Sequence, residues 1–169
     1  MQKKRYESPL FTVTLFVLIG LGLIASILDS TSIASSKGNV IKVESLSGIN
    51  QALLVVGLGM IVLGATIRLV AMATLKKNFS GRLRIRDDHT LVKNGIYHLV
   101  RHPAYLGAIL LFLGIPVMLP SVLGFLVTFL LAPYLLHRIK LEERMLTERF
   151  GAEYEEYIKH SNKLIPFLY

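Results

Sequence analysis

The sequence predicts an all-α integral membrane protein with four transmembrane helices, a C-terminal helical hairpin and short cytoplasmic amphipathic helices. Three observations lead to this fold class. Hydrophobic residues make up 53% of the 169-residue chain, which is above the roughly 45–50% of an ordinary soluble domain. The hydrophobic residues are gathered in long runs, and the mean hydropathy is +0.55. Basic residues lie between these runs and give a formal net charge of +8.

Each of the two apolar runs in the N-terminal half predicts one span, because a helix needs about 20 apolar residues to cross a bilayer. The first span is 9–28. The second is 49–73, with Arg68 near its end. The first run could instead be a signal peptide with Ser32-Ile33-Ala34 as its cleavage site. Its apolar core is longer than the roughly 7–15 residues of a typical signal peptide, which favours a span.

The third apolar run, 103–136, contains no charged residue and is long for a single span. Pro116 and Pro120 flank a predicted turn, because proline cannot donate a helical hydrogen bond and clashes with the preceding turn. We therefore expect a tight hairpin of two spans, 103–118 and 121–140. The second of these should continue past the apolar run as a helix.

The basic residues predict the orientation of these four spans. They cluster in the N-terminal tail, between the second and third spans, and after the apolar part of the hairpin. The hairpin turn has no charged residue, and the loop 29–47 has as many acidic as basic residues. With four spans, all basic clusters fall on one side of the membrane. The positive-inside rule then places both termini in the cytoplasm. The clustered residues are Lys3, Lys4, Arg5, Lys76, Lys77, Arg82, Arg84, Arg86, Lys93, Arg101, Arg138, Lys140 and Arg144.

Composition also restricts the class of function. An excess of basic over acidic residues occurs in nucleic-acid-binding proteins. Here the basic residues adjoin apolar runs, which favours contact with lipid headgroups, and no nucleic-acid partner is expected. The chain has no cysteine, so disulfides, thiol nucleophiles and cysteine metal sites are excluded. His89, His98 and His102 lack the spacing of a zinc-binding helix, and no metal site is expected.

Glycines inside the second span raise the possibility of a nucleotide-binding loop. Gly57, Gly59 and Gly64 follow no strand, however, and lie in an apolar run. Close packing of helices through small residues is the favoured interpretation.

Charged residues follow the last apolar run. Arg138 and Glu142 are four residues apart and share a helix face, whereas Glu143 points about 100° away around the helix. An exposed ion pair of this spacing would stabilise the helix by only a few tenths of a kcal/mol. At a membrane edge, a charged side chain either reaches the headgroups or faces a polar cavity.

A second, short amphipathic helix should follow this long one. Gly151 is a predicted helix stop. After it, Tyr154, Tyr157 and Ile158 form an apolar stripe at helical spacing, so this helix should lie at the cytoplasmic surface and cover a pocket.

Three segments between Asp88 and Phe167, about half of the chain, carry a family resemblance. They are His89-Thr90-Leu91-Val92 with Gly95-Ile96-Tyr97 and Arg101-His102-Pro103-Ala104-Tyr105; Arg138 with Glu142-Glu143; and Phe150-Gly151-x-Glu153-Tyr154-x-x-Tyr157, ending at Ile165-Pro166-Phe167. Together they resemble the isoprenylcysteine carboxyl methyltransferases. These belong to a wider group of membrane methyltransferases that includes the phospholipid N-methyltransferases.

The resemblance implies a single domain, 1–169, whose part 82–167 binds S-adenosylmethionine on the cytoplasmic side. The family's substrate arginine falls on Arg138, which, with Glu142, makes up the expected catalytic pair. A further polar cofactor contact of the family falls near Arg82, where a basic residue departs from the pattern. The implied cofactor contacts are His89, Thr90, Leu91, Val92, Tyr97, His102, Pro103, Ala104, Tyr105 and Glu142.

The activity implied is carboxyl O-methylation of a prenylated cysteine, or of a similar lipophilic substrate that enters from the bilayer. The planar fork of Arg138 suits a carboxylate, and Glu142 can accept hydrogen bonds from hydroxyls or an ammonium group. A carboxylate is already a nucleophile, so the reaction needs in-line positioning rather than a strong base.

Other activities remain open at this point. A phospholipid amine or a thiol as methyl acceptor would require a proton acceptor, for which Glu143 and His102 are the nearby candidates. Membrane reductases that use a nicotinamide cofactor carry a related Arg-His-Pro-x-Tyr segment, but they are longer and have more spans. The sequence does not predict the oligomeric state.

Overall fold

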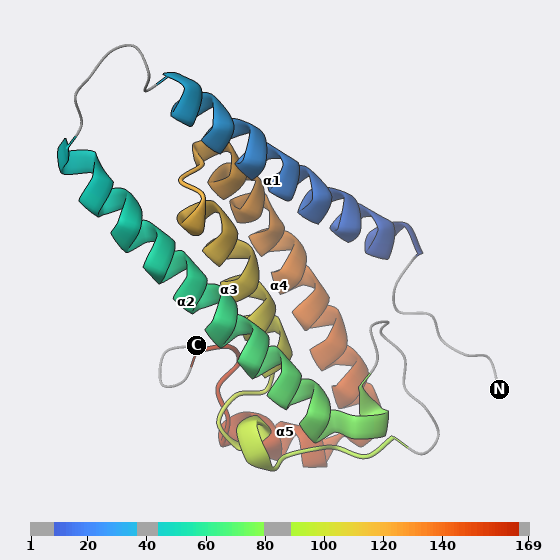
Figure 1. The fold of residues 1–169 in the computed structure, drawn as a ribbon. Helices are drawn as coiled ribbons and strands as arrows, with labels where there is room; N and C mark the ends of the chain where they lie inside the picture. The colour runs from blue at the N-terminus through green and yellow to red at the C-terminus, as the bar shows by residue number, and fades with distance from the viewer. Residues whose placement is uncertain (1–8, 37–43, 80–88, 166–169) are drawn as a thin grey trace.

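The computed structural model describes residues 9–36, 44–79 and 89–165. In these ranges, all the secondary-structure elements are helices (Figure 1). Several predictions concern residues outside these ranges, namely the basic tail, part of the predicted loop 29–47, Arg82, Arg84, Arg86 and the Pro166-Phe167 end. The elements in chain order are α1 (Pro9–Ser36), α2 (Glu44–Leu75), η1 (Lys76–Asn78), η2 (Gly95–His98), α3 (Pro103–Met118), α4 (Val122–Phe150) and α5 (Ala152–Lys159).

The first helix is longer than the sequence predicted. A loop was expected to begin at Asp29, but α1 continues to Ser36. Residues 29–36 contain neither proline nor glycine, so nothing in the backbone chemistry stops the helix there. The second predicted span, 49–73, lies inside α2, which begins at Glu44 and ends at Leu75.

Helices α2 and α3 pack together through glycines. A Cβ atom added at Gly64 would lie 2.6 Å from the carbonyl oxygen of Gly107, and one added at Gly114 would lie 2.8 Å from that of Gly57. The two backbones therefore touch, as the small-residue pattern predicted for Gly57 and Gly64. For Gly59 that prediction is wrong, because its Cβ would meet no atom within 4 Å.

Helix α1 packs along α4 and caps its first turn. Ser121 Oγ donates to Asp29 Oδ2 over 2.9 Å, and the backbone N–H of Leu123 donates to the same oxygen over 3.2 Å. Gly124 N–H in turn donates to Ser121 Oγ over 2.9 Å. These bonds satisfy N–H groups at the start of α4 that have no partner within the helix. The cap thus joins two helices at the end of the bundle that contains the α3–α4 turn.

The outer faces of the long helices are apolar. Two helical stretches in the described ranges, 51–78 and 122–150, are long and apolar enough to cross a membrane, and shorter apolar helical stretches cover 17–29 and 103–118. Large side chains on these faces are exposed, including Val55 at 66% and Phe129 at 67%. A soluble monomer rarely exposes so much continuous apolar surface, whereas lipid would cover it.

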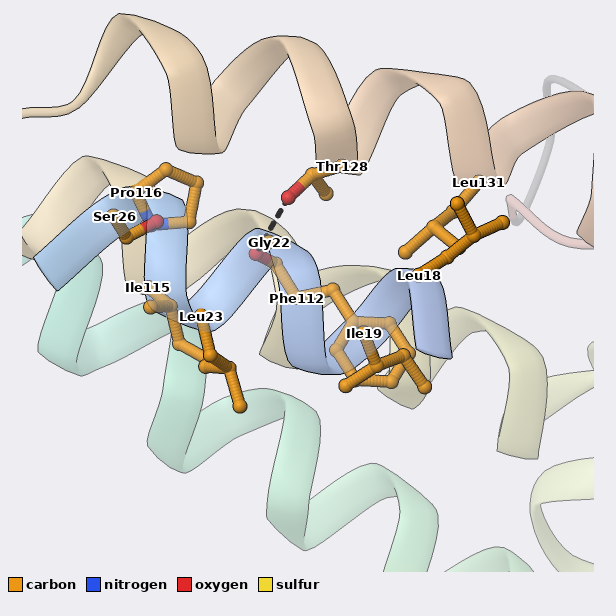
Figure 2. Close-up of a pocket in the computed structure, with 10 residues that line it drawn as sticks. All are labelled: Leu18, Ile19, Gly22, Leu23, Ser26, Phe112, Ile115, Pro116, Thr128 and Leu131. Carbon is orange, nitrogen blue, oxygen red and sulfur yellow. Dashed lines mark hydrogen bonds between the residues drawn. The ribbon is translucent and has the colours of Figure 1, made fainter. Parts of the chain in front are cut away.

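A shallow apolar cleft lies among α1, α3 and α4 (Figure 2). Thr128 Oγ1 points across it and donates to the carbonyl oxygen of Phe112 over 3.5 Å. The remaining lining is mostly aliphatic. The lining residues are Leu18, Ile19, Gly22, Leu23, Ser26, Phe112, Ile115, Pro116, Thr128 and Leu131.

The other end of the bundle is closed by α5 (Figure 1). Gly151 ends α4 with a φ of 53°, a conformation that favours glycine, so the predicted helix stop is confirmed. Tyr154 and Tyr157 of α5 are buried, but Ile158 is 37% exposed and does not share their buried face. We call the region formed by η2, the start of α3, the second half of α4, α5 and the chain up to residue 165 the α5 end.

Candidate active site

The start of α3 is held by the chain that follows α5. His102 is the N-cap residue of α3, with a φ of −123° and a ψ of 53°, and Pro103 is the first residue of the helix. Its N–H donates to the carbonyl oxygen of Lys163 over 3.1 Å, and the N–H of Arg101 donates to that of Asn162 over 2.8 Å. The Arg-His-Pro segment is therefore fixed by backbone bonds, with the His102 side chain 3% exposed.

A hydrogen-bonded chain of three side chains connects α3 and α4. Arg138 Nε donates to the hydroxyl oxygen of Tyr105 over 3.0 Å, and that hydroxyl donates to Glu142 Oε2 over 2.7 Å. Arg138 is only 6% exposed. Arg138 and Glu142 lie one turn apart on α4, so Tyr105 bridges the two groups that the sequence placed on one face. We call these three residues the Arg–Tyr–Glu chain.

Glu143 faces a different set of groups, as expected from its angle to Glu142. Its carboxylate lies 3.3 Å from Arg101 Nε, 3.3 Å from His102 Nε2 and 3.1 Å from Lys163 Nζ. Glu143 lies three residues beyond the predicted span 121–140. Burial raises the pKa of this carboxyl, but the hydrogen bonds and charges of His102 and Lys163 outweigh burial and lower the pKa to about 2. Glu143 thus ties α4 to both α3 and the C-terminal chain.

Tyr97 lies beneath α5. It is 6% exposed, and its carbonyl oxygen accepts a hydrogen bond of 2.5 Å from the Tyr157 hydroxyl. Burial, together with the negative charge of Glu142, raises the pKa of the Tyr97 hydroxyl. Burial also raises the pKa of Tyr157 to about 12. Both phenols therefore stay neutral and can act as hydrogen-bond donors at physiological pH.

The segment 89–92 contacts α4 at a later point of the helix than Glu142. The His89 ring packs at a centroid distance of 6.1 Å from that of Phe150, and Asn78 Nδ2 donates to Thr90 Oγ1 over 3.0 Å. Phe150 is eight residues after Glu142, which corresponds to about 12 Å along a helix. Of the expected cofactor contacts, those at 102–105, Tyr97 and Glu142 lie together, and His89 and Thr90 line the periphery. Leu91 and Val92 are half-buried.

Two groups at this site were not singled out from the sequence. Lys163 bonds Glu143, and Arg68 of α2 donates from Nη1 to the carbonyl oxygen of Ala104 over 3.0 Å. A charged residue in an apolar span was the available signal for Arg68. Lys163 lies in a mixed polar stretch, where nothing distinguishes it from other surface lysines.

The site offers a defined set of chemical groups. The buried Arg138 can receive a carboxylate, and within the described ranges Tyr105 is the only hydrogen-bond donor to Glu142. The second oxygen of Glu142 can therefore accept a bond from a ligand. The rings of Tyr97, His102 and Tyr105 provide flat apolar surfaces; His102 and Tyr105 meet edge to face with centroids 5.7 Å apart. No group of three histidines, aspartates or glutamates that could hold a metal ion occurs among the described residues.

Comparison with known proteins places this site in a family context. The sequence model of the isoprenylcysteine carboxyl methyltransferase (ICMT) family matches residues 56–148. A probable protein-S-isoprenylcysteine O-methyltransferase of Oryza sativa subsp. indica is 38% identical over 116 residues, covering 67% of this chain and 61% of the relative. The Saccharomyces cerevisiae protein-S-isoprenylcysteine O-methyltransferase is 35% identical over 131 residues, covering 76% and 55% respectively.

The fold is also similar to a solved structure. The eukaryotic intramembrane Ras methyltransferase ICMT, determined without a monobody, superposes with a TM-score of 0.70 at 26% sequence identity. The match covers 95% of this chain and 53% of that one. The chain therefore spans between half and two thirds of the length of these relatives.

Proposed function

The chain belongs to the isoprenylcysteine carboxyl methyltransferase family, and from this membership we propose that it is a membrane methyltransferase that uses S-adenosylmethionine to esterify the carboxylate of a prenylated cysteine or a similar lipophilic substrate. The observation that carries the proposal is the Arg–Tyr–Glu chain, in which Arg138 is buried and Tyr105 and Glu142 are half-buried. It fixes a cation suited to a carboxylate one helical turn from an anion suited to a polar or cationic ligand.

The residues at the α5 end fit the methyl donor chemically. The donor consists of an adenine ring, ribose hydroxyls, an amino-acid head and a positively charged sulfur, and when bound it supplies the activated methyl group. Tyr97, His102 and Tyr105 offer ring surfaces of the kind that enclose adenine. Glu142 would hold a hydroxyl or the ammonium, since one of its oxygens is not engaged by the described residues. His89, Thr90, Leu91, Val92, Pro103 and Ala104 would complete the donor site.

Arg138 would hold the carboxylate of the acceptor. Its Nε donates to the Tyr105 hydroxyl, which orients the guanidinium, and a guanidinium has the planar shape that suits a bidentate interaction with a carboxylate. An acceptor carboxylate is already deprotonated at neutral pH, so Arg138 has only to orient it and no side chain has to remove a proton. The burial of Arg138 and Tyr97 would limit access of water to the reacting groups.

The same proposal includes the topology. We propose four membrane spans formed by α1 to α4, with both termini and the α5 end in the cytoplasm. The apolar outer faces, the basic residues after α2 and those in the second half of α4 support this arrangement. An acceptor anchored by its lipid chain would then reach Arg138 from the bilayer.

Labelled-methyl transfer tests the activity. Detergent-purified protein would be incubated with methyl-labelled S-adenosylmethionine and farnesylcysteine, and base-labile label would identify a methyl ester. We expect Arg138→Gln to reduce the transfer rate by about 100-fold, because the acceptor loses a charged, bidentate partner. Lys140→Gln, an exposed neighbour on α4, serves as the matched control and should retain the wild-type rate.

Other results would redirect the assignment. Label that is base-stable and appears only on phospholipid amines or thiols would contradict ester formation and favour the other acceptor classes. Equal rates for Arg138→Gln and the Lys140 control would remove Arg138 from the acceptor site.

A further inference from the structure

The end of α2 carries a strained turn. Lys76 follows the last residue of the helix, Leu75, and has a φ of 50°. Among the described residues it is the only one other than glycine with a positive φ. A residue with a side chain adopts this left-handed conformation at a cost in free energy, and such strain is often kept at functional sites. The N–H of Phe79 donates to the Lys76 carbonyl oxygen over 3.2 Å and closes the turn.

Two residues after Lys76, the side chain of Asn78 lies against Thr90. Asn78 Nδ2 donates to Thr90 Oγ1 over 3.0 Å, and the N–H of Thr90 donates to Asn78 Oδ1 over 3.5 Å. The amide is therefore donor and acceptor toward the same residue, as an asparagine side chain can be. Because the two bonds reach the hydroxyl and the backbone of Thr90, they fix both its position and its orientation. We call this pair of bonds the Asn78 clamp.

The backbone that follows Thr90 depends on this clamp. Within the described ranges, residues 90–93 make no backbone–backbone hydrogen bond, so no secondary structure holds them in place. The bond from Thr90 N–H to Asn78 is the only hydrogen bond to a backbone group of these residues there. A segment with few hydrogen bonds moves easily unless side chains tie it to a rigid element. The rigid element here is α2.

Other side chains contact this segment at its two ends. The His89 ring packs on that of Phe150, with centroids 6.1 Å apart. Lys93 pairs with Glu153 over 2.8 Å, but these side chains are 44% and 54% exposed, and an exposed ion pair contributes little to stability. Neither contact bonds the backbone between them. The Asn78 clamp is thus the contact that sets the path of the chain from 90 to 92.

The clamped segment leads into the candidate active site. Leu91 and Val92 are half-buried, and the chain then reaches Gly95 and Tyr97 of η2. The end of α2 supports this point as well, because a Cβ added at Gly95 would lie 3.5 Å from Cγ2 of Thr74. The last turn of α2 and the residues after it therefore hold the path to Tyr97 at two points.

We propose that Asn78 is a positioning residue of the donor site, whose side-chain amide holds Thr90 and thereby keeps the segment 89–92 in place to contact the methyl donor. This inference rests on the proposed function. In this role Asn78 acts through Thr90 and does not touch the reacting atoms. Its loss should weaken donor binding, because the donor must then also order the segment. The acceptor should be unaffected, because Arg138 lies on α4.

Two measurements on the detergent-purified full chain test the assignment. Hydrogen–deuterium exchange of the ligand-free protein reports on the clamp, and calorimetric titration with S-adenosylhomocysteine reports on the donor site. The variants are Asn78→Ala, which removes the amide, and Asn78→Asp, whose carboxylate can still accept bonds from the Thr90 N–H and hydroxyl. The matched control is Asn94→Ala, because Asn94 is exposed and its side chain makes no capping hydrogen bond.

We expect the Thr90 amide of Asn78→Ala to exchange several-fold faster than that of the wild type. This variant should bind S-adenosylhomocysteine about three- to ten-fold more weakly, as expected for the loss of a neutral hydrogen bond. The KM for S-adenosylmethionine should rise by a similar factor, whereas the KM for farnesylcysteine and the melting temperature should stay nearly unchanged. Asn78→Asp should lie between the wild type and Asn78→Ala, and Asn94→Ala should match the wild type.

Other outcomes would overturn the assignment. Unchanged exchange in Asn78→Ala would mean that the clamp does not form. Faster exchange with unchanged affinity would mean that the clamp forms but does not position the donor site. Equal rises in both KM values with a lower melting temperature would mean a general structural role. In each of these cases the wild-type protein still binds the ligand, whereas a folded wild-type protein that bound none would contradict the proposed function as well.

Discussion

The α2–α3 contact and the α5 end are both buried contacts between helices, but opposite kinds of group hold them together. At the α2–α3 contact, Gly64 and Gly107 bring two backbones together because neither has a side chain. At the α5 end, polar side-chain atoms of Tyr105, Glu142 and Glu143 form hydrogen bonds and ion pairs. The first region depends on the close fit of two helix backbones, and the second on hydrogen bonds and ion pairs between side chains. Substitutions in the first region should therefore lower stability, whereas removing the Tyr105–Glu142 contact in the second should mainly lower activity.

The strongest test of this contrast is Tyr105→Phe. Loss of the hydroxyl leaves Arg138 Nε and Glu142 Oε2 without their shared partner while the ring still fills the same space. We expect kcat/KM for methyl transfer to fall about 10–100-fold, equivalent to roughly 1.4–3 kcal/mol, with the melting temperature nearly unchanged. Steady-state kinetics and thermal melts in detergent measure both quantities. A lowered melting temperature with unchanged kcat/KM would reverse the contrast.

The matching test at the glycine contact is Gly64→Ala. The added methyl group would lie 2.6 Å from the Gly107 carbonyl oxygen, so the helices must separate. We expect a loss of stability of about 1–3 kcal/mol, seen as a lower melting temperature. Gly59→Ala is the control on the same helix, because its methyl group would meet no atom within 4 Å. Equal melting temperatures for the two variants would show that α2 and α3 are not in such close contact.

The lowered pKa of Glu143 predicts that stability depends on pH through the α5 end and not through the α2–α3 contact. Its pKa is lowered in the folded protein from 4.5 to about 2, so its ion pairs stabilise the fold above about pH 4.5. That contribution should decline as the pH falls from 4.5 toward 2, because over this range the unfolded chain takes up a proton at Glu143 more readily than the folded protein does. The advantage of the wild type over Glu143→Gln in thermal melts should therefore shrink over this range.

The control for this experiment is Glu156→Gln. Glu156 also pairs with basic neighbours, Lys159 and His160, but its side chain is 59% exposed and its substitution should change the melting temperature little. A constant difference between the wild type and Glu143→Gln across the pH range would mean that the charge of Glu143 does not stabilise the fold.

The smallest expected effect concerns the cap of α4, at the end remote from the site. Asp29→Ala removes the acceptor for Ser121 and Leu123 N–H and should lower stability by about 1 kcal/mol. Its affinity for S-adenosylhomocysteine should equal that of the wild type, because the cap lies at the α3–α4 turn. Weakened ligand binding would show that the two ends of the bundle are coupled.

The sequence predicted the parts of the fold that depend on local pattern. The bounds predicted for the third span, 103–118, are those of α3, although Pro116 lies inside this helix and does not end it, and Gly151 gave the end of α4. The end of α1 was missed, because Asp29 looked like a loop residue when its partners, almost a hundred positions away, were unknown. The outward-facing Gly59 was likewise indistinguishable from its buried neighbours, since helix rotation depends on tertiary packing.

At the candidate site, too, the sequence predicted local features but not contacts between distant residues. The spacing of Arg138, Glu142 and Glu143 correctly separated the two glutamates into different surroundings. Spacing could not reveal that Tyr105 bridges the first pair, or that Lys163 and Arg101 meet at Glu143. These contacts connect residues 20 to 42 positions apart. The roles of the site residues toward a methyl donor remain predictions from family resemblance and geometry.

The central claim is that the α5 end binds a methyl donor through Glu142. The most direct measurement is a calorimetric titration of detergent-purified, monodisperse protein with S-adenosylhomocysteine, carried out for the wild type and for Glu142→Ala. The account predicts saturable micromolar binding that the substitution weakens by about ten-fold or more without loss of folded protein. Absence of binding to folded wild-type protein, or equal affinity in the variant, would contradict it.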